Sequence, residues 1–277
     1  MSDLSGRSAV VTGGGSGIGA ALVRRLVGAG AHVTVADLDV DAALGVADAL
    51  DGPGTATAAH LDVRDASAVA GVVDEVVARH GALDLMFNNA GITFGGETHE
   101  LTLDHWNAII DVNIRGVVHG VAAAYPVMVR QGHGHIVNTA SMGGLMAAGL
   151  ITSYVMSKHA VVGLSLALRT EAAAHGVGVT ALCPAAVETP ILDKGELGRF
   201  RGRDYYLKGQ GIRHPLDPDT LAKEALAAVA ANRPLLVTPR AARMAWRVGR
   251  LAPTFVSKAG TRFVAKQRRL QEAEAVR

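Results

Sequence analysis

A tyrosine and a lysine four residues apart, Tyr154 and Lys158, are the side chains that most directly suggest proton-transfer chemistry. On a helix, residues at this spacing share one face. A free tyrosine has a pKa of about 10, and a nearby ammonium group lowers that pKa by favouring the phenolate. Such a phenol can donate a proton to a ketone, and its phenolate can accept one from an alcohol. The spacing predicts a general acid/base at Tyr154, assisted by Lys158.

Ser141, at the end of the expected strand His135–Ser141, could supply a hydroxyl that hydrogen-bonds a developing alkoxide. Strand ends of doubly wound folds open toward the ligand crevice. A tyrosine–lysine pair that lies beside such a strand end is therefore expected to be functional, whereas an isolated pair more often packs on the surface. A serine hydrolase would need a Gly-x-Ser-x-Gly elbow with a supporting histidine. The first glycine is absent before Ser141, and His159 is expected to point about 100° away from Lys158 around the helix.

A glycine-rich turn follows the first expected strand, Arg7–Thr12, and opens into a helix at Gly17. Glycines let the backbone approach a pyrophosphate, and the helix N-terminus presents free N–H groups to the phosphates. A P-loop would require a lysine and a serine or threonine after the last glycine, where Ala20 and Ala21 stand. The residues expected to bind a dinucleotide here are Gly13, Gly15, Ser16, Gly17, Ile18 and Gly19.

Asp37 ends the second expected strand, 18 residues after Gly19. A carboxylate at this place can accept both ribose hydroxyls of adenosine, and it would repel a 2′-phosphate. Leu38 and Ser16 supply no positive charge for such a phosphate. The pattern therefore favours NAD over NADP, the alternative being that Asp37 only caps the helix that starts near Asp39.

Strands and helices must alternate to position these side chains, and the first 180 residues show that alternation. This alternation predicts a parallel sheet with helices on both faces. Because crossovers between parallel strands are right-handed, the predicted fold is a doubly wound, Rossmann-like α/β fold. We expect one domain over residues 1–239 and a basic helical extension over 240–277. The expected strands are Arg7–Thr12, Ala31–Asp37, Thr55–Asp62, Leu83–Asn88, His135–Ser141, Gly178–Cys183 and Leu235–Thr238. The expected helices are Gly17–Val27, Val40–Leu50, Ala66–His80, Leu103–Asn113, Ile114–Arg130 and Ser153–His175.

The composition, with 49% hydrophobic and 19% charged residues, excludes a disordered chain. The single cysteine, Cys183, excludes an intrachain disulfide, fits a reducing compartment and is expected to be buried. No apolar run approaches the roughly 20 residues that span a bilayer, and the N-terminus lacks secretory-signal features, so we expect a cytoplasmic protein. The eleven histidines include no His-Glu-x-x-His pattern, and no metal is expected.

Five motifs resemble, in order and spacing, the short-chain dehydrogenase/reductase family over about residues 5–190. They are Thr12–Gly19, Asn88-Asn89-Ala90-Gly91, Asn113, Ser141 and Tyr154-Val155-Met156-Ser157-Lys158. The resemblance implies an NAD(H)-dependent oxidoreductase that moves a hydride between nicotinamide and a secondary alcohol or ketone. It implies that Ser141 orients the oxyanion and that Lys158 also binds the nicotinamide ribose. It further implies that Asn113 anchors a water that relays protons to that lysine.

The same resemblance implies further contacts and an assembly. Asp62 and Val63 would hold the adenine, and a loop with Ala185 in the usual glycine position would contact the nicotinamide, Val187 and Thr189 binding its carboxamide. A substrate lid would span about residues 190–215, and the two long helices 114–130 and 153–175 would pair subunits in a homotetramer or dimer. The other residues implied to line the cofactor are Asn89, Ala90, Gly91 and Pro184.

The substrate side and the tail leave alternatives open. Apolar and aromatic lid residues suit a hydrophobic alcohol or ketone. The cations Arg199, Arg201, Arg203 and Lys208 could meet an anionic substrate or form a solvated charged face, and we expect the charged face. Residues 240–277 contain ten Lys or Arg and two Glu, partly at helical spacing. We expect this tail to pack on a neighbouring subunit or to lid the pocket, without nucleic acid. The alternatives are a membrane-surface-associated reductase tethered by the tail and a dinucleotide-binding regulatory protein without turnover.

Overall fold

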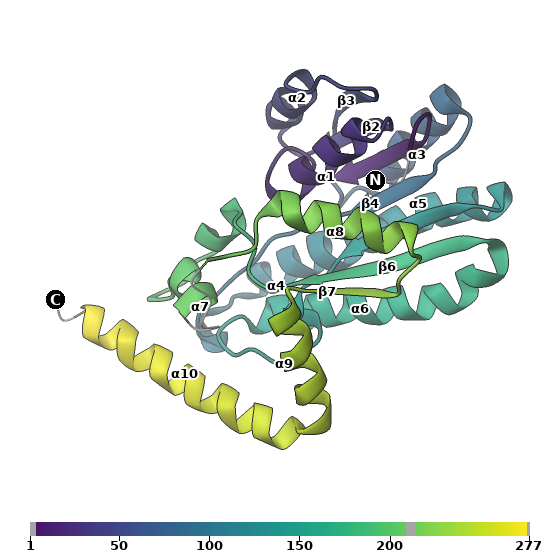
Figure 1. Ribbon diagram of the computed structural model, residues 1–277. Helices are drawn as coiled ribbons and strands as arrows, with labels where there is room; N and C mark the ends of the chain where they lie inside the picture. The colour runs from purple at the N-terminus through teal and green to yellow at the C-terminus, as the bar shows by residue number, and fades with distance from the viewer. Residues whose placement is uncertain (1–3, 209–213, 276–277) are drawn as a thin grey trace.

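The computed structural model describes residues 4–208 and 214–275, and its strands form one seven-stranded sheet (Figure 1). All neighbouring strands are parallel, in the order β3-β2-β1-β4-β5-β6-β7. The order reverses between β1 and β4, which is where open α/β sheets bind ligands. The expected doubly wound fold is confirmed. The strands are β1 (Ser8–Thr12), β2 (His32–Asp37), β3 (Thr55–His60), β4 (Leu85–Asn88), β5 (Gly134–Thr139), β6 (Val177–Pro184) and β7 (Leu235–Thr238).

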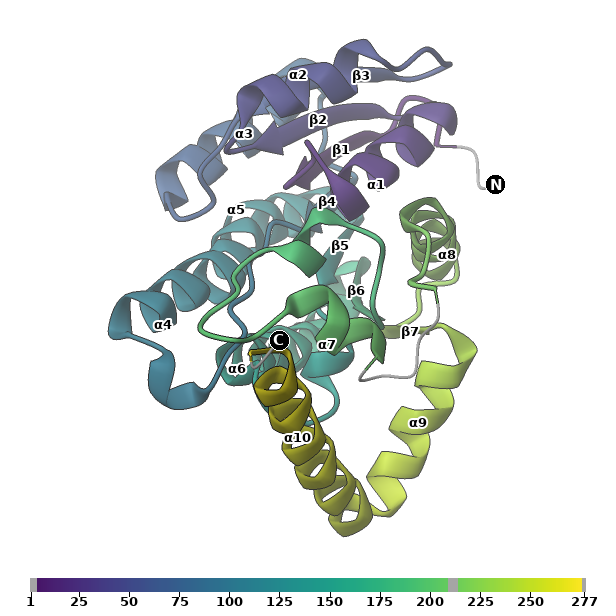
Figure 2. The ribbon, with the colours of Figure 1, turned by 90° about the vertical axis from the view of Figure 1, so that its left-hand side faces the viewer.

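Helices cover both faces of the sheet, as the view of Figure 2 shows. Side chains of α1, α2 and α8 pack with the strands into one buried apolar cluster. Side chains of α3, α5 and α6 form a second cluster on the opposite face. The bounds of the helices on these faces are α1 (Gly17–Gly28), α2 (Val40–Asp48), α3 (Ala66–His80), α4 (Leu103–Ile110), α5 (Gly116–Gln131), α6 (Thr152–Ala172) and α8 (Pro218–Ala230).

Two features of the helices differ from expectation. The helix α8 was not expected, although Asp217 caps it by accepting from the Thr220 amide at 2.9 Å and Pro218 begins it. The boundary expected at Asn113 is not a break: a π-helical segment, Asp111–Arg115, joins α4 to α5. Such segments are rare and often occur at functional sites.

The stretch Leu103–Gln131 is long and apolar enough, by length and composition only, to cross a membrane. Its α5 portion nevertheless packs on β4, β5 and α3. Buried residues such as Val117 and Met128 belong to the apolar clusters of the sheet. We therefore assign this stretch to the core of the α/β fold.

The C-terminal region leaves the sheet after β7 as α9 (Arg240–Leu251), and α10 (Pro253–Ala275) then turns back toward α7 (Gly202–Lys208) (Figures 1 and 2). Trp246 of α9 packs against buried residues that include Val161 and Val237. Phe263 and Val264 of α10 pack against a cluster that includes Leu150. The tail thus packs on its own subunit through one face.

Candidate active site

The carboxyl end of β5 and the first turns of α6 bring Ser141, Tyr154 and Lys158 together. The Ser141 hydroxyl accepts from the Gly143 amide at 3.0 Å and lies close enough to the Tyr154 phenol to lower its pKa. The Lys158 ammonium lies 5.6 Å from the centre of the Tyr154 ring and donates to the Thr139 carbonyl at 2.8 Å. The four-residue spacing therefore produces the shared face that was expected.

Burial dominates the titration of this pair. It raises the pKa of Tyr154, against the smaller lowering effect of the hydrogen bond from Ser141. Burial also lowers the pKa of Lys158 to about 8. The sequence had predicted a tyrosine pKa lowered by the ammonium, but in the protein alone burial raises the pKa of Tyr154. At neutral pH the site therefore contains a protonated phenol beside a cation.

Asn113 lies in the π-helical segment and is fully buried. Its side-chain amide donates to the Ile92 carbonyl at 2.9 Å and to the Ser157 hydroxyl at 3.0 Å, and its Oδ1 accepts from the Ile92 amide at 2.8 Å. A Cβ atom at Gly91 would lie 3.3 Å from Asn113 Oδ1 and 3.4 Å from Lys158 Nζ. Asn113 therefore fixes the segment after β4 beside the lysine.

The turn between β1 and α1 has the geometry of a phosphate cradle. Gly13 and Gly17 have φ values of +64° and +51°, which glycine adopts without strain. No side chain caps the α1 N-terminus at Ser16, and its first turn contains no acidic residue. The backbone N–H groups there remain available to an anion, so the turn fits a dinucleotide pyrophosphate.

Asp37 faces this turn from the end of β2. Its Oδ2 accepts from the Gly15 amide at 2.9 Å, and its Oδ1 accepts from the Asp39 amide at 3.0 Å. The N-cap of α2 is Asp39, whose carboxylate accepts from the Ala42 amide at 3.0 Å. Capping of α2 therefore does not account for Asp37, whose carboxylate is held against the glycine turn.

Asn89 ties three strand ends together beneath the same turn. Its side-chain amide donates to the carbonyls of Thr12 at 3.1 Å and Gly13 at 3.2 Å. The Thr139 hydroxyl donates to Asn89 Oδ1 at 3.2 Å, and the Ala90 amide donates to the Thr12 hydroxyl at 3.1 Å. These bonds hold the ends of β1, β4 and β5 in register around the crevice.

The loop after β6 closes over the glycine turn. Val187 is buried and forms an isolated bridge to Leu216. A Cβ atom at Gly17 would lie 2.9 Å from the Thr189 methyl group. Ala185, in place of the usual glycine, donates its amide to the Thr238 carbonyl at 2.9 Å, so the loop from Pro184 onward remains attached to β7.

Asp62 and Val63 follow β3. The Asp62 carboxylate accepts from Arg64 Nε at 2.9 Å, and this hydrogen bond lowers the pKa of Asp62. Val63 is buried, and its side chain lies beside Gly116. A contact of these two residues with adenine remains a prediction.

Comparison with known proteins decides the family. A model of the short chain dehydrogenases matches residues 7–197. The chain belongs to the short-chain dehydrogenase/reductase family. The 2,5-dichloro-2,5-cyclohexadiene-1,4-diol dehydrogenase of Sphingobium indicum is 40% identical over 196 residues, 70% of this chain and 78% of the relative. The D-beta-hydroxybutyrate dehydrogenase of Rhizobium meliloti is 33% identical over 232 residues, 79% of this chain and 90% of the relative.

A solved structure gives the same result at the level of the fold. The crystal structure of a short chain dehydrogenase/reductase from Burkholderia phymatum in complex with NAD is similar, with a TM-score of 0.82 and 31% identity. The match covers 92% of this chain and 96% of that one. The protein described here is thus an oxidoreductase of the short-chain dehydrogenase/reductase family.

The predicted substrate side would combine the segment after β4 with the predicted lid, residues 190–215. The Thr93 hydroxyl hydrogen-bonds the Tyr206 hydroxyl at 3.2 Å. Burial raises the pKa of Tyr206, and the nearby Tyr154 raises it further. Phe200 and Tyr205 are buried within the lid. Phe94 turns away to a ring contact with His105, 4.7 Å between centres, so it packs beside α4.

Two lid arginines are neutralised by neighbours. Arg203 pairs with Glu188 at 2.7 Å and with Asp193 at 2.8 Å. Arg201 lies 3.7 Å from Glu196. These guanidinium groups are engaged within the lid, which favours a solvated charged face over an anion-binding role. The side chain of Lys208 lies outside the described residues.

The histidine and the cysteine singled out in the sequence both lie outside the predicted catalytic group. His159 is exposed and hydrogen-bonds the Val155 carbonyl at 2.9 Å, and Cys183 is buried, as expected. Residues 4–208 and 214–275 contain no group of three or more His, Cys, Asp or Glu side chains that could hold a metal ion.

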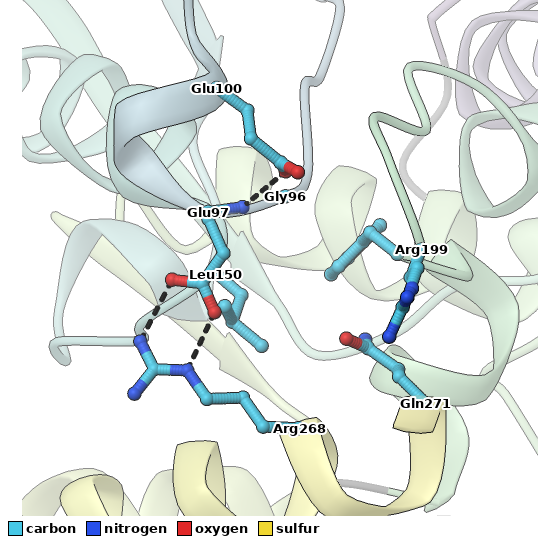
Figure 3. A pocket seen from close by; sticks show the side chains of 8 residues that line it. Gly96, Glu97, Glu100, Leu150, Arg199, Arg268 and Gln271 are labelled. Carbon is cyan, nitrogen blue, oxygen red and sulfur yellow. Dashed lines mark hydrogen bonds and ion pairs between the residues drawn. The ribbon is translucent and has the colours of Figure 1, made fainter. Parts of the chain in front are cut away.

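Helix α10 packs beside Tyr154, a position that the sequence of the tail allowed but did not specify. Phe263 and Val264 belong to the cluster that contains Tyr154, Leu150 and Ile151. Arg268 donates two hydrogen bonds to Glu97, at 2.6 and 2.8 Å, across a cavity of about 260 Å³ (Figure 3). The apolar pair in the tail was visible in the sequence, but the location of its partners was not.

Proposed function

We propose that the protein transfers a hydride between NAD(H) and the carbon of a secondary alcohol or ketone, with Tyr154 as the general acid/base. The observation that carries this proposal is the grouping of Ser141 beside Tyr154, with Lys158 one helical turn away. This group lies at the carboxyl ends of the strands, on the side of the uncapped turn before α1. Acid/base, oxyanion donor and phosphate cradle therefore open onto one crevice.

In the reductive direction, NADH held by the glycine turn and by Lys158 would supply the hydride that the carbonyl carbon receives. The Tyr154 hydroxyl gives its proton to the carbonyl oxygen, and the Ser141 hydroxyl hydrogen-bonds that oxygen as negative charge develops. The Lys158 ammonium stabilises the phenolate that is left. Asn113 holds the segment beside the lysine in place, and we propose that it also anchors a proton-relaying water. In the oxidative direction the phenolate accepts the alcohol proton.

We propose NAD as the preferred dinucleotide. Asp37 faces the glycine turn, where its carboxylate can accept the ribose hydroxyls of adenosine and repel a 2′-phosphate. The next side chain, Leu38, is 60% exposed and carries no charge. The proposed cofactor contacts otherwise follow the sequence expectations for the turn, the segment after β4 and the loop after β6.

The proposed substrate is a neutral, hydrophobic alcohol or ketone, and cyclic secondary alcohols are the first class to test. The engaged lid arginines disfavour a carboxylate substrate, as a hydroxybutyrate would require, and apolar residues surround Tyr154. The relative that is 40% identical is named for a cyclic diol.

The test uses wild type and Tyr154→Phe with NAD⁺ and a panel of cyclic alcohols, following NADH absorbance. We expect turnover by wild type and a loss of at least about 10²-fold in kcat for Tyr154→Phe, because proton transfer typically contributes that much. NADH binding should be unchanged. The matched control is Tyr125→Phe, whose ring stacks edge-on with His175 away from the site. Equal turnover by Tyr154→Phe and wild type would defeat the proposal.

We further propose that the enzyme works in the cytoplasm as a dimer or tetramer that pairs α5 and α6. Large apolar side chains are exposed on both helices, with Val118 at 42%, Met156 at 38% and Leu166 at 37%. Sedimentation equilibrium would measure the mass, and a monomer at micromolar concentration would contradict the pairing.

A further inference from the structure

An apolar corner joins α9 to α10 and points outward. We define it as Met244, Val248, Leu251 and Phe255, which are 58%, 50%, 88% and 68% exposed. The spacing from Met244 to Leu251 places three of them on one helix face. The inward face of α9 is occupied instead by Trp246, which packs on the body of the enzyme. This apolar face is therefore additional to the one that holds the tail in place.

A basic stripe continues from the corner along the outer face of α10. We define it as Lys258, Arg262, Lys266 and Arg269, all exposed. Their spacing of three and four residues puts them on one face of the helix, opposite the inward Phe263, Val264 and Gln267. Among the described residues none of the four forms an ion pair, whereas Arg268, beside them, pairs with Glu97.

We propose that the apolar corner and the basic stripe dock the enzyme on the surface of an anionic lipid bilayer. A helix with outward apolar side chains and a row of cations suits this interface, because the apolar groups enter the headgroup boundary while the cations meet anionic lipids. In Figure 2 the corner lies at the end of the V formed by α9 and α10, away from the sheet. A flat surface can therefore approach it without contacting the sheet.

Two other occupants fit less well. A second copy related by a two-fold axis would place one basic stripe against an identical stripe, and like charges repel. A nucleic acid would use the cations, since phosphate contacts dominate its affinity, but it would leave the apolar corner in water. The lipid surface is the occupant that uses both parts.

The two faces of α10 connect the surface to the substrate side. Its outer face carries the basic stripe, and its inner face packs in the cluster that contains Tyr154 and the buried lid residues Phe200 and Tyr205. Docking would bring the substrate side close to the bilayer, where a hydrophobic alcohol or ketone is concentrated. This last step rests on the proposed function; the docking itself does not.

The test is cosedimentation of the full-length protein with phosphatidylserine-containing vesicles and with phosphatidylcholine vesicles. We expect binding to the anionic vesicles only, weakening as salt is raised. Lys258→Gln/Arg262→Gln should bind about 25-fold more weakly, because each cation near such a surface is worth about five-fold. Leu251→Ser/Phe255→Ser should also lose binding.

Matched controls separate this surface from general charge and hydrophobicity. Arg24→Gln/Lys223→Gln removes two exposed charges from α1 and α8, and Leu103→Ser removes a side chain that is 78% exposed on α4. Both controls should bind the vesicles like wild type. NADH titration of every variant reports the fold, independently of turnover.

Three results would overturn the docking proposal. They are failure of wild type to sediment with anionic vesicles, equal binding to phosphatidylcholine, and wild-type binding by both double variants of the tail. A smaller sedimentation mass for the corner variant without vesicles would assign the corner to a second copy instead. Competition by duplex DNA that the corner variant does not alter would assign the basic stripe to a polyanion. Absence of turnover with vesicle binding intact would contradict only the proposed function.

Discussion

Replacing Gly19 with alanine is expected to abolish dinucleotide binding. A Cβ atom at this position would lie 2.0 Å from the Gly13 carbonyl oxygen and 2.8 Å from Asn89 Nδ2, whereas ordinary van der Waals contact begins at 3.4 Å. The distance between this Cβ atom and the Gly13 oxygen must therefore grow by about 1.4 Å, and this requires the backbone of the turn to move. Overpacking typically costs about 1–3 kcal/mol, and this rigid contact should lie near the upper end.

The effect on binding follows from the displaced turn. A misplacement of about 1 Å in a positioned site can cost about 10²-fold, so we expect the Kd for NADH to rise at least about 100-fold. That change corresponds to about 2.7 kcal/mol. The assay is titration of NADH fluorescence, which needs no knowledge of the substrate, with circular dichroism to verify that Gly19→Ala remains folded.

The matched control is Gly28→Ala, at the other end of the same helix. No heavy atom lies within 4 Å of a Cβ built there, so the added methyl group meets open space. Alanine should be neutral or slightly stabilising at this position, by up to about 1 kcal/mol, with NADH affinity unchanged. If folded Gly19→Ala bound NADH as tightly as wild type, the assignment of this turn to the pyrophosphate would be wrong.

Three further predictions address cofactor choice, acid stability and the tail. Asp37→Ser should narrow or reverse the preference for NADH over NADPH in parallel titrations, because it removes the charge that repels a 2′-phosphate; an unchanged ratio would contradict the role of Asp37. Burial lowers the pKa of His135 from 6.5 to about 4, so the unfolded chain takes up a proton first and the free energy of unfolding should fall as pH drops from 6.5 toward 4. The loss should reach about 3 kcal/mol in urea titrations, and His135→Gln should lack it; the same pH dependence in both proteins would refute this origin. Phe263→Ala should lower Tm through the loss of about 2 kcal/mol of half-buried packing, whereas Phe255→Ala, 68% exposed, should not; equal Tm values would contradict packing of α10.

The parts of the site that could be predicted depend on spacing along the chain. A strand, a glycine turn and a helix follow one another directly around Gly13–Gly19, and a four-residue interval suffices to align Tyr154 with Lys158. Local geometry of this kind requires no knowledge of distant segments. The doubly wound parallel sheet also followed, because right-handed crossovers leave few arrangements for alternating strands and helices.

The parts that could not be predicted depend on burial and on partners distant in sequence. The pKa of Tyr154 is raised rather than lowered because the fold removes water from the phenol, and no motif reports that burial. The lid cations could not be assigned before Arg203 was found between Glu188 and Asp193. The helix Pro218–Ala230 was overlooked although Asp217 and Pro218 form a recognisable start signal.

The ion pair between Arg268 and Glu97 joins residues 171 positions apart, and it has a consequence for biosynthesis. Chains fold from the N-terminus during translation, at about 5–20 residues per second, so the sheet and the glycine turn can assemble while α10 is still being made. The last helix then packs beside Tyr154, on the proposed substrate side. A product released early, after β7, is expected to sequester NADH while leaving its alcohol or ketone site open to water.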